Sequence, residues 1–76
     1  MEGLTNKQKE YLSYIEQFIK DVGYPPTQRE CANAFGVTVM AARDVIYTLK
    51  KKGYIDFIEG KYRTIKVLKR SLQESN

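Results

Sequence analysis

The side chains of this sequence that are best suited to chemistry are basic, and most of them lie in one stretch of the chain. Residues 50 to 70 hold eight lysines and arginines against two acidic residues, a charge of +6, whereas the whole chain of 76 residues carries +4. Concentrated positive charge favours a polyanionic partner such as nucleic acid, because contact with phosphates releases condensed counterions. Charge by itself leaves open the alternative that this stretch is only a solvated, lysine-rich surface.

Other residue types argue against catalysis and metal binding. The sequence has no histidine and a single cysteine, Cys31, which has no histidine to activate its thiol. It also lacks a glycine-rich phosphate loop and a paired nucleophile and base. We therefore predict no enzymatic activity, no catalytic residue, no metal, no cofactor and no small-molecule substrate, and we assign Cys31 to the core.

The length of the chain and its apolar pattern limit what can surround these residues. A chain of 76 residues makes one small domain. It contains no run of about 20 apolar residues that could cross a membrane, and an unpaired cysteine is typical of proteins inside the cell. We expect a soluble, cytoplasmic protein that associates with the nucleoid and has no membrane partner.

The first helix is predicted from its cap and its apolar spacing. Thr5 and Gln8 form a capping box, in which the threonine hydroxyl accepts from a free backbone amide and the glutamine reaches back to the cap. Gly23 ends the helix, and the corner at residues 24 to 26, with its two prolines, cannot continue it. Between Asn6 and Val22, apolar residues recur every three or four positions and define one inward stripe: Tyr11, Leu12, Ile15, Phe18, Ile19 and Val22.

Two further helices follow. Thr27 and Glu30 form a second capping box, which opens a short helix that runs through Phe35. After a glycine-bearing break of about three residues, a third helix begins at Thr38 or Val39. The residues expected to face inward from these two helices are Cys31, Ala32, Phe35, Ala42, Val45, Ile46 and Leu49.

A hairpin is predicted after Gly53, which stops the third helix. From Tyr54 the apolar period changes to two, and a turn is expected at residues 59 to 61. An isolated hairpin is only marginally stable, so its apolar face should pack on the helices. The residues of that face are Ile55, Phe57, Ile65 and Val67.

These elements predict a mainly α fold with a small β-hairpin, namely a three-helix winged helix-turn-helix. Residues 1 to 68 would form this DNA-binding domain and residues 69 to 76 a flexible C-terminal tail. A single helix fits the major groove of B-form DNA, and a hairpin beside it can reach phosphates or the minor groove. The candidate base readers are Thr38, Met40, Ala41, Arg43, Asp44 and Tyr47, and the candidate phosphate contacts are Gln28, Lys52, Lys61 and Arg63.

The side chains of these residues can bind base edges in the major groove of DNA. An arginine such as Arg43 donates to guanine, and a carboxylate such as Asp44 accepts from cytosine or orients the arginine. The apolar side chains of Met40 and Ala41 suit the methyl group of thymine. The basic residues Lys61 and Arg63 lie beside the predicted turn of the hairpin, from which they could reach phosphates.

Several motifs resemble the amino-terminal DNA-binding domain of LexA repressors over residues 4 to 68. The most specific is the block from Gly23 to Glu30, with the pattern G-x-P-P-T-x-x-E; Phe35-Gly36-Val37, Lys52-Gly53, Gly60, Arg63 and Ile65 match as well. The resemblance implies a winged helix-turn-helix that binds operator DNA as a transcriptional regulator. It also places Met40, Ala41, Arg43 and Asp44 at the base-contacting positions, although their identities differ from those usual in the family.

LexA repressors continue into a self-cleaving peptidase domain that also dimerises them, whereas this sequence stops at Asn76. We expect either a stand-alone regulator, of phage or mobile-element origin, or an excised domain. Tight operator binding should then need a second copy on a neighbouring half-site.

One alternative function stays open at this point. The apolar helix start Val39-Met40-Ala41 suits a protein surface better than a DNA groove. The same fold would then serve as a protein interaction module, such as an antirepressor or an adaptor.

Overall fold

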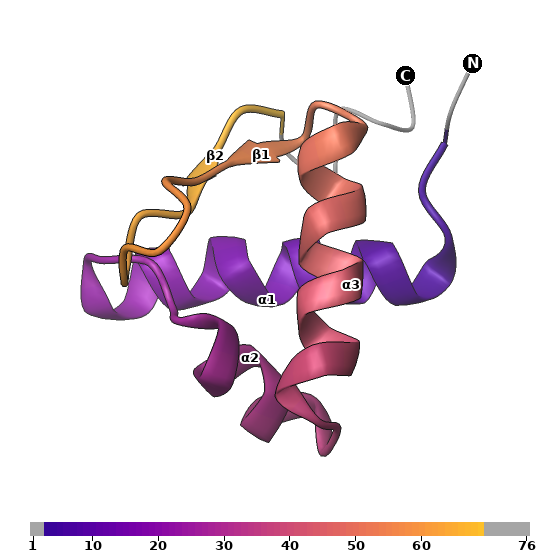
Figure 1. The fold of residues 1–76 in the computed structure, drawn as a ribbon. Coiled ribbons are helices and arrows are strands. Elements are labelled where there is room, and N and C mark those ends of the chain that lie inside the picture. Colours follow the sequence, from indigo (N-terminus) through magenta and orange to yellow (C-terminus); the bar gives the residue numbers. More distant parts are fainter. Residues whose placement is uncertain (1–2, 70–76) are drawn as a thin grey trace.

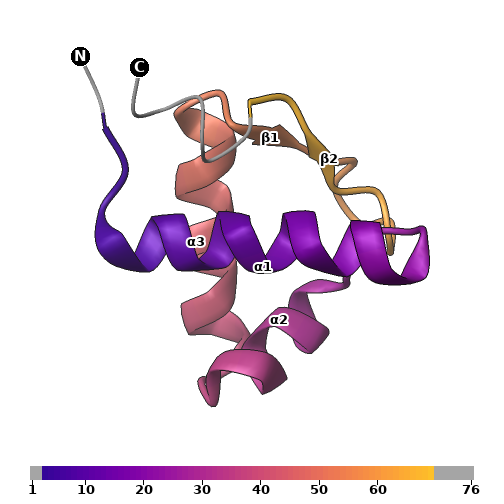
Figure 2. The same cartoon turned by 180° about the vertical axis from the view of Figure 1, so that it is seen from behind.

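The computed structural model describes residues 3 to 69, which form three helices and a two-stranded antiparallel sheet (Figure 1). Helix α3 crosses α1, α2 lies beside the N-terminal half of α3, and the sheet lies at the other end of α3 (Figures 1 and 2). The elements are α1 (Asn6–Val22), α2 (Gln28–Phe35), α3 (Val39–Lys51), β1 (Ile55–Asp56) and β2 (Lys66–Val67). The predicted fold class, a three-helix winged helix-turn-helix, is confirmed.

Both predicted capping boxes are present. The hydroxyl of Thr5 accepts from the amide of Gln8 at 3.2 Å, and the Gln8 side chain accepts from the amide of Thr5 at 3.0 Å. The corresponding distances for Thr27 and Glu30 are 3.0 and 2.9 Å. Each box satisfies two amides that the helix leaves unpaired, which contributes on the order of 1 kcal/mol per cap. The local sequence therefore defines where α1 and α2 begin.

The turn between α2 and α3 depends on Gly36. Its φ of 65° lies in the left-handed region, which a residue without a Cβ adopts at little cost. In this conformation the amide of Val37 donates to the carbonyl of Ala32 at 3.0 Å, which closes the end of α2. The chain then turns into α3 within a few residues, as a helix-turn-helix requires.

One hydrophobic core joins all the elements. Leu12, Ile15, Ile46 and Leu49 are fully buried, and Cys31 lies among them with no exposed surface. The sheet closes one end of this core: Ile55, Phe57 and Ile65 are buried, and Val67 is packed against them as predicted. The aromatic rings of Tyr11 and Phe35 stack with centroids 4.1 Å apart, which fastens α1 to α2.

Val22 departs from the predicted stripe. Its side chain is 45% exposed, whereas Leu12 and Ile15 of the same helix are fully buried. Val22 is the last residue of α1, and Gly23 turns the chain immediately after it, so the end of the helix lies past the elements that cover its middle. The prediction that this residue faces the core was wrong because periodicity identifies a face but not its covered length.

The hairpin is also shorter than its alternating pattern suggests. Each strand has two residues, with Ile55 opposite Val67 and Asp56 opposite Lys66, and residues 57 to 65 form a loop. The side chain of Asp56 accepts from the amide of Phe57 at 2.9 Å, and the hydroxyl of Thr64 accepts from the amide of Ile58 at 3.0 Å. These side chains thus bind backbone amides that would otherwise be available for hydrogen bonds between longer strands. We call residues 55 to 67 the wing.

The predicted domain boundary stays a prediction, and the predicted tail lies outside the described residues except for Lys69. Among residues 3 to 69, no helix combines the length and the apolar character that a membrane crossing requires.

Candidate nucleic-acid interface

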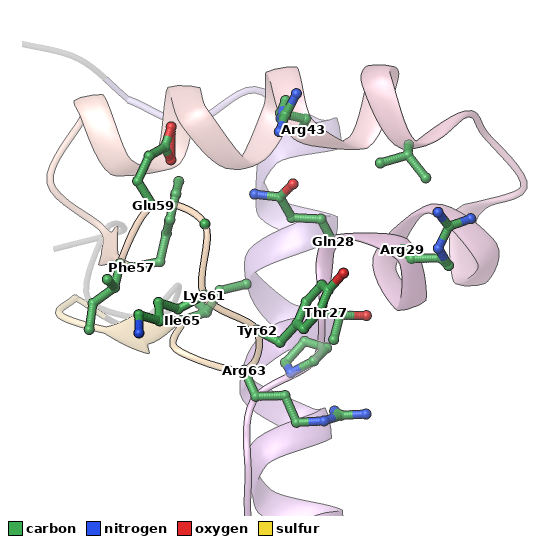
Figure 3. A pocket seen from close by; sticks show the side chains of 14 residues that line it. Thr27, Gln28, Arg29, Arg43, Phe57, Glu59, Lys61, Tyr62, Arg63 and Ile65 are labelled. Atoms are coloured by element: carbon green, nitrogen blue, oxygen red, sulfur yellow. The ribbon is translucent and has the colours of Figure 1, made fainter.

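An open groove of about 820 Å³ separates the wing from the start of α2 and from α3 (Figure 3). Arg43 lines it from α3, Gln28 and Arg29 line it from α2, and Lys61 and Tyr62 line it from the wing. Residues that lie 33 positions apart in the sequence, Gln28 and Lys61, therefore border one surface. Four basic side chains, Arg29, Arg43, Lys61 and Arg63, border it against one carboxylate, that of Glu59.

The start of α3 presents a polar cap and two exposed apolar side chains. Thr38 is the N-cap, and its hydroxyl accepts from the amide of Ala41 at 3.1 Å. Met40 is 68% exposed and Ala41 is exposed beside it. This face at the start of α3 therefore does not contribute to the core of the domain.

Arg43 and Asp44 lie one turn further along α3, and both are exposed. Neither makes an ion pair within residues 3 to 69. The Arg43 guanidinium lies 6.0 Å from the centre of the Tyr47 ring, at the limit of a cation–π contact. The donors of Arg43 and the acceptors of Asp44 are thus open to another molecule, and their assignment as base readers stays a prediction.

Tyr47 links α3 to the wing. Its hydroxyl donates a hydrogen bond to the Glu59 carboxylate, and its ring lies 5.3 Å from the ring of Phe57. This hydrogen bond raises the pKa of Tyr47, because the neutral phenol is the form that can donate to Glu59. The sequence singled out Tyr47 as a reader but missed Glu59, whose approach depends on the path of the wing loop.

The wing carries Lys61 and Tyr62 at the tip of its loop. The amide of Lys61 donates to the carbonyl of Ile58 at 3.1 Å, which forms the turn. Both side chains are exposed, Tyr62 by 87%. Arg43 of α3 and Lys61 of the wing thus line the same groove.

Arg63 has a different environment from the one predicted. Its guanidinium donates to both carboxylate oxygens of Glu30 at 2.9 Å and to the carbonyl of Pro25 at 3.2 Å, and it lies 4.7 Å from the centre of the Tyr24 ring. The hydrogen bonds from Arg63 and from the Thr27 amide hold the pKa of the Glu30 carboxyl below its usual value. Its three partners belong to the corner before α2 and to α2 itself, so Arg63 fastens the wing to this part of the chain.

Lys52 lies away from the groove. Its Nζ donates to the carbonyl of Gly3 and to the side chain of Gln8, both at 2.8 Å. These bonds tie the end of α3 to the N-terminal cap of α1, at the far end of α1 from the wing (Figure 1). The structure thus brings Gln28 and Lys61 to one surface, but it does not bring Lys52 there.

The sequence-based selection missed Arg29. This residue is exposed in the first turn of α2, lines the groove and makes no ion pair within residues 3 to 69. The signal that could have marked Arg29 as a candidate phosphate contact is its position two residues after the N-cap Thr27. Side chains at this position lie beside the positive end of the helix dipole, where an anion is favoured.

Cys31 has the structural environment that was predicted for it. Burial raises the pKa of its thiol to about 12, so almost none of it is ionised near neutral pH.

Comparison with known proteins identifies relatives of the chain. The sequence model of the LexA DNA-binding domain matches residues 1 to 64. The LexA repressor of Leptospira interrogans is 39% identical over 75 residues, which is 99% of this chain and 37% of the relative. The LexA repressor of Thermotoga neapolitana is 45% identical over 69 residues, which is 91% of this chain and 35% of the relative. The chain thus spans little more than a third of the length of these curated relatives.

Proposed function

The chain belongs to the LexA DNA-binding domain family, and from this membership we propose that it is a sequence-specific, double-stranded DNA-binding transcriptional regulator that acts as a repressor. The observation that supports this best is the groove, because it sets the free donors of Arg43 beside Gln28, Arg29 and Lys61. An exposed helix and a basic loop on one face match the two features that a duplex offers, namely base edges and phosphates. The proposal assigns no enzymatic step to this domain.

The base contacts come from the first half of α3. The major groove of B-form DNA, about 12 Å wide, admits an α-helix, and side chains near the helix start reach base edges. Arg43 donates to guanine O6 and N7, and Asp44 accepts from a cytosine amino group. Met40 and Ala41 contact thymine methyl groups, and Thr38 and Tyr47 border these readers on either side.

The phosphate contacts come from both sides of the groove. Gln28 and Arg29 lie in the first turn of α2, where free amides and the helix dipole favour an anion. Lys61 contacts the backbone from the wing. We assign no phosphate to Arg63 or Lys52, because both donate to their own chain.

A second copy of the chain belongs to this proposal. One domain with four base-reading side chains makes few base contacts, and a specific complex usually needs more. Two copies on neighbouring half-sites would supply the affinity that a repressor requires. Binding to chromosomal operators would place the protein in the cytoplasm, at the nucleoid.

The deciding experiment selects binding sites from a randomised duplex and then titrates the chain with the selected duplex and with a scrambled one at several salt concentrations. We expect tighter binding to the selected duplex and affinities that fall as salt rises. On the selected duplex, amide chemical shifts should move around Arg43 and Lys61. Binding without sequence preference would refute the reader assignment, and a lack of any salt-dependent binding would favour a protein partner instead.

A further inference from the structure

One carboxylate joins the helix-turn-helix to the wing. Glu30 completes the capping box of α2 by accepting from the amide of Thr27, and it also accepts both hydrogen bonds of the Arg63 fork. Planar guanidinium and planar carboxylate match in this geometry, which adds orientation as well as attraction. The wing is thereby held in a fixed position relative to the start of α2.

The backbone of Arg63 has a conformation that needs such support. Its φ is 56°, and within residues 3 to 69 it is the one residue other than glycine with a positive φ. A side chain with a Cβ rarely adopts this conformation unless its surroundings hold it. The surroundings are Glu30, the carbonyl of Pro25 and the ring of Tyr24.

The wing packs its apolar residues Ile55, Phe57 and Ile65 on the core, but few polar contacts attach its loop to the helices. Its ladder has two residues a strand, and Lys50 and Tyr47 attach the first half of the loop through the Phe57 carbonyl and through Glu59. Apart from the buried side chain of Ile65, the second half of the loop reaches the helices through the polar contacts of Arg63. Lys61 lies between these two attachments, so its distance from α2 depends on both.

Building on the proposed function, we propose that Glu30 and Arg63 are positioning residues, which hold Lys61 across the groove from α2, and that Arg63 does not itself neutralise a phosphate. The two possible roles of Arg63 make opposite predictions for the variant Glu30→Gln. Removing an anion beside the groove strengthens DNA binding if only electrostatics matter. It weakens DNA binding if the wing loses its place.

The variant Glu30→Gln is suited to this test because glutamine also completes a capping box, so α2 keeps its start. We expect its affinity for the selected duplex to fall about two- to fivefold, the range set by an exposed ion pair. Arg63→Lys should cause a similar loss, since lysine keeps the charge but cannot form the fork. Glu10→Gln, which removes an exposed carboxylate from α1, is the matched control and should not weaken binding.

The salt dependence gives an independent measurement. In the Lys61→Gln background, where displacement of Lys61 can no longer change the slope, Arg63→Gln should leave the slope of log affinity against log salt unchanged, whereas loss of a further phosphate contact would reduce it by about 0.9. In the Arg63→Gln background, Glu30→Gln should no longer weaken binding, because the pair is already broken. Unchanged or tighter binding by Glu30→Gln in the wild-type background, or a further reduced slope when Arg63→Gln is added to Lys61→Gln, would overturn the proposal.

The wing can also be followed without DNA. If Glu30 positions it, Glu30→Gln should shift the amide signals of Lys61, Tyr62 and Thr64 in the free chain, while circular dichroism shows an unchanged helix content. Absence of these shifts would contradict the inference even if no duplex bound. Failure of the wild-type chain to bind any duplex would contradict the proposed function alone.

Discussion

Replacing Lys61 by glutamine should reduce both the affinity for DNA and its dependence on salt by amounts that follow from the structure. Within residues 3 to 69, three cations of the groove have no carboxylate partner, namely Arg29, Arg43 and Lys61. If Arg43 reads a base and the other two neutralise one phosphate each, the slope of log affinity against log salt is about −1.8 per domain. Without Lys61 it should be about −0.9.

The same relation gives the loss of affinity. Near 0.1 M salt, one phosphate contact is worth about 0.9 decades of affinity, so Lys61→Gln should bind roughly eightfold more weakly. The difference should disappear as the salt concentration approaches about 1 M, because screening then removes the electrostatic contribution. This convergence distinguishes a lost phosphate contact from a distorted wing, which would weaken binding at every salt concentration.

Fluorescence anisotropy of a labelled duplex, titrated at salt concentrations from about 0.05 to 0.3 M, measures both quantities. Lys7→Gln is the matched control, since it removes the same charge from an exposed position in the first turn of α1, at the end of α1 away from the wing (Figure 2). Its slope should stay near the wild-type value. Equal slopes for Lys61→Gln and Lys7→Gln would refute the reasoning, because net charge rather than position would then govern binding.

Three further changes and one chemical probe test other parts of the structure. Arg43→Gln should relax discrimination at one base pair by about 1–3 kcal/mol in a repeated site selection, and an unchanged preference there would contradict its assignment as a reader. Ile46→Ala should lower the free energy of unfolding by about 2–5 kcal/mol in urea denaturation, because this side chain is fully buried; a smaller loss would mean that the core collapses around it. The pKa of the Glu30 carboxyl is lower in the folded chain than in the unfolded one. The stability that this carboxylate adds to the fold is therefore fully present above the usual pKa of glutamate, and it is lost as the pH falls through the lowered pKa of the folded chain. Urea midpoints of the wild-type chain should therefore fall more steeply over that acid range than those of Arg63→Gln. A thiol reagent at pH 8 should modify Cys31 only as fast as the chain opens, because its pKa of about 12 leaves the folded thiol unionised; rapid modification would show that the site is accessible.

The sequence was sufficient for the elements and for the exposure of several residues of the candidate site. Capping boxes, the glycine at position 36 and the three-to-four-residue spacing all act within one or two turns, so they can be recognised without knowing the fold. The same local rules placed Arg43 and Asp44 on the outer face of α3, because a helix with Ala42, Ile46 and Leu49 inward turns positions 43 and 44 outward.

Local rules were less successful where an element ends. Val22 matches the period of α1, but the covered length of a helix depends on what packs against it. The wing keeps the predicted inward residues, yet hydrogen bonds from its own side chains shorten the ladder to two residues a strand. Patterns of alternation report which face is apolar, and they do not report how far backbone pairing continues.

The roles of individual charged side chains were decided by tertiary structure. The partners of Arg63, Lys52 and Tyr47 lie 33, 44 and 12 positions away in the sequence, and no local pattern marks them. Composition predicts that a basic stretch repels itself and attracts phosphate, but each charge interacts most strongly with whatever the fold brings within a few ångströms. The sequence thus determined the helices, the core and the cationic character of the chain, whereas the crossing of α1, α2 and α3 decided which cations remain free for DNA and which hold the wing in place.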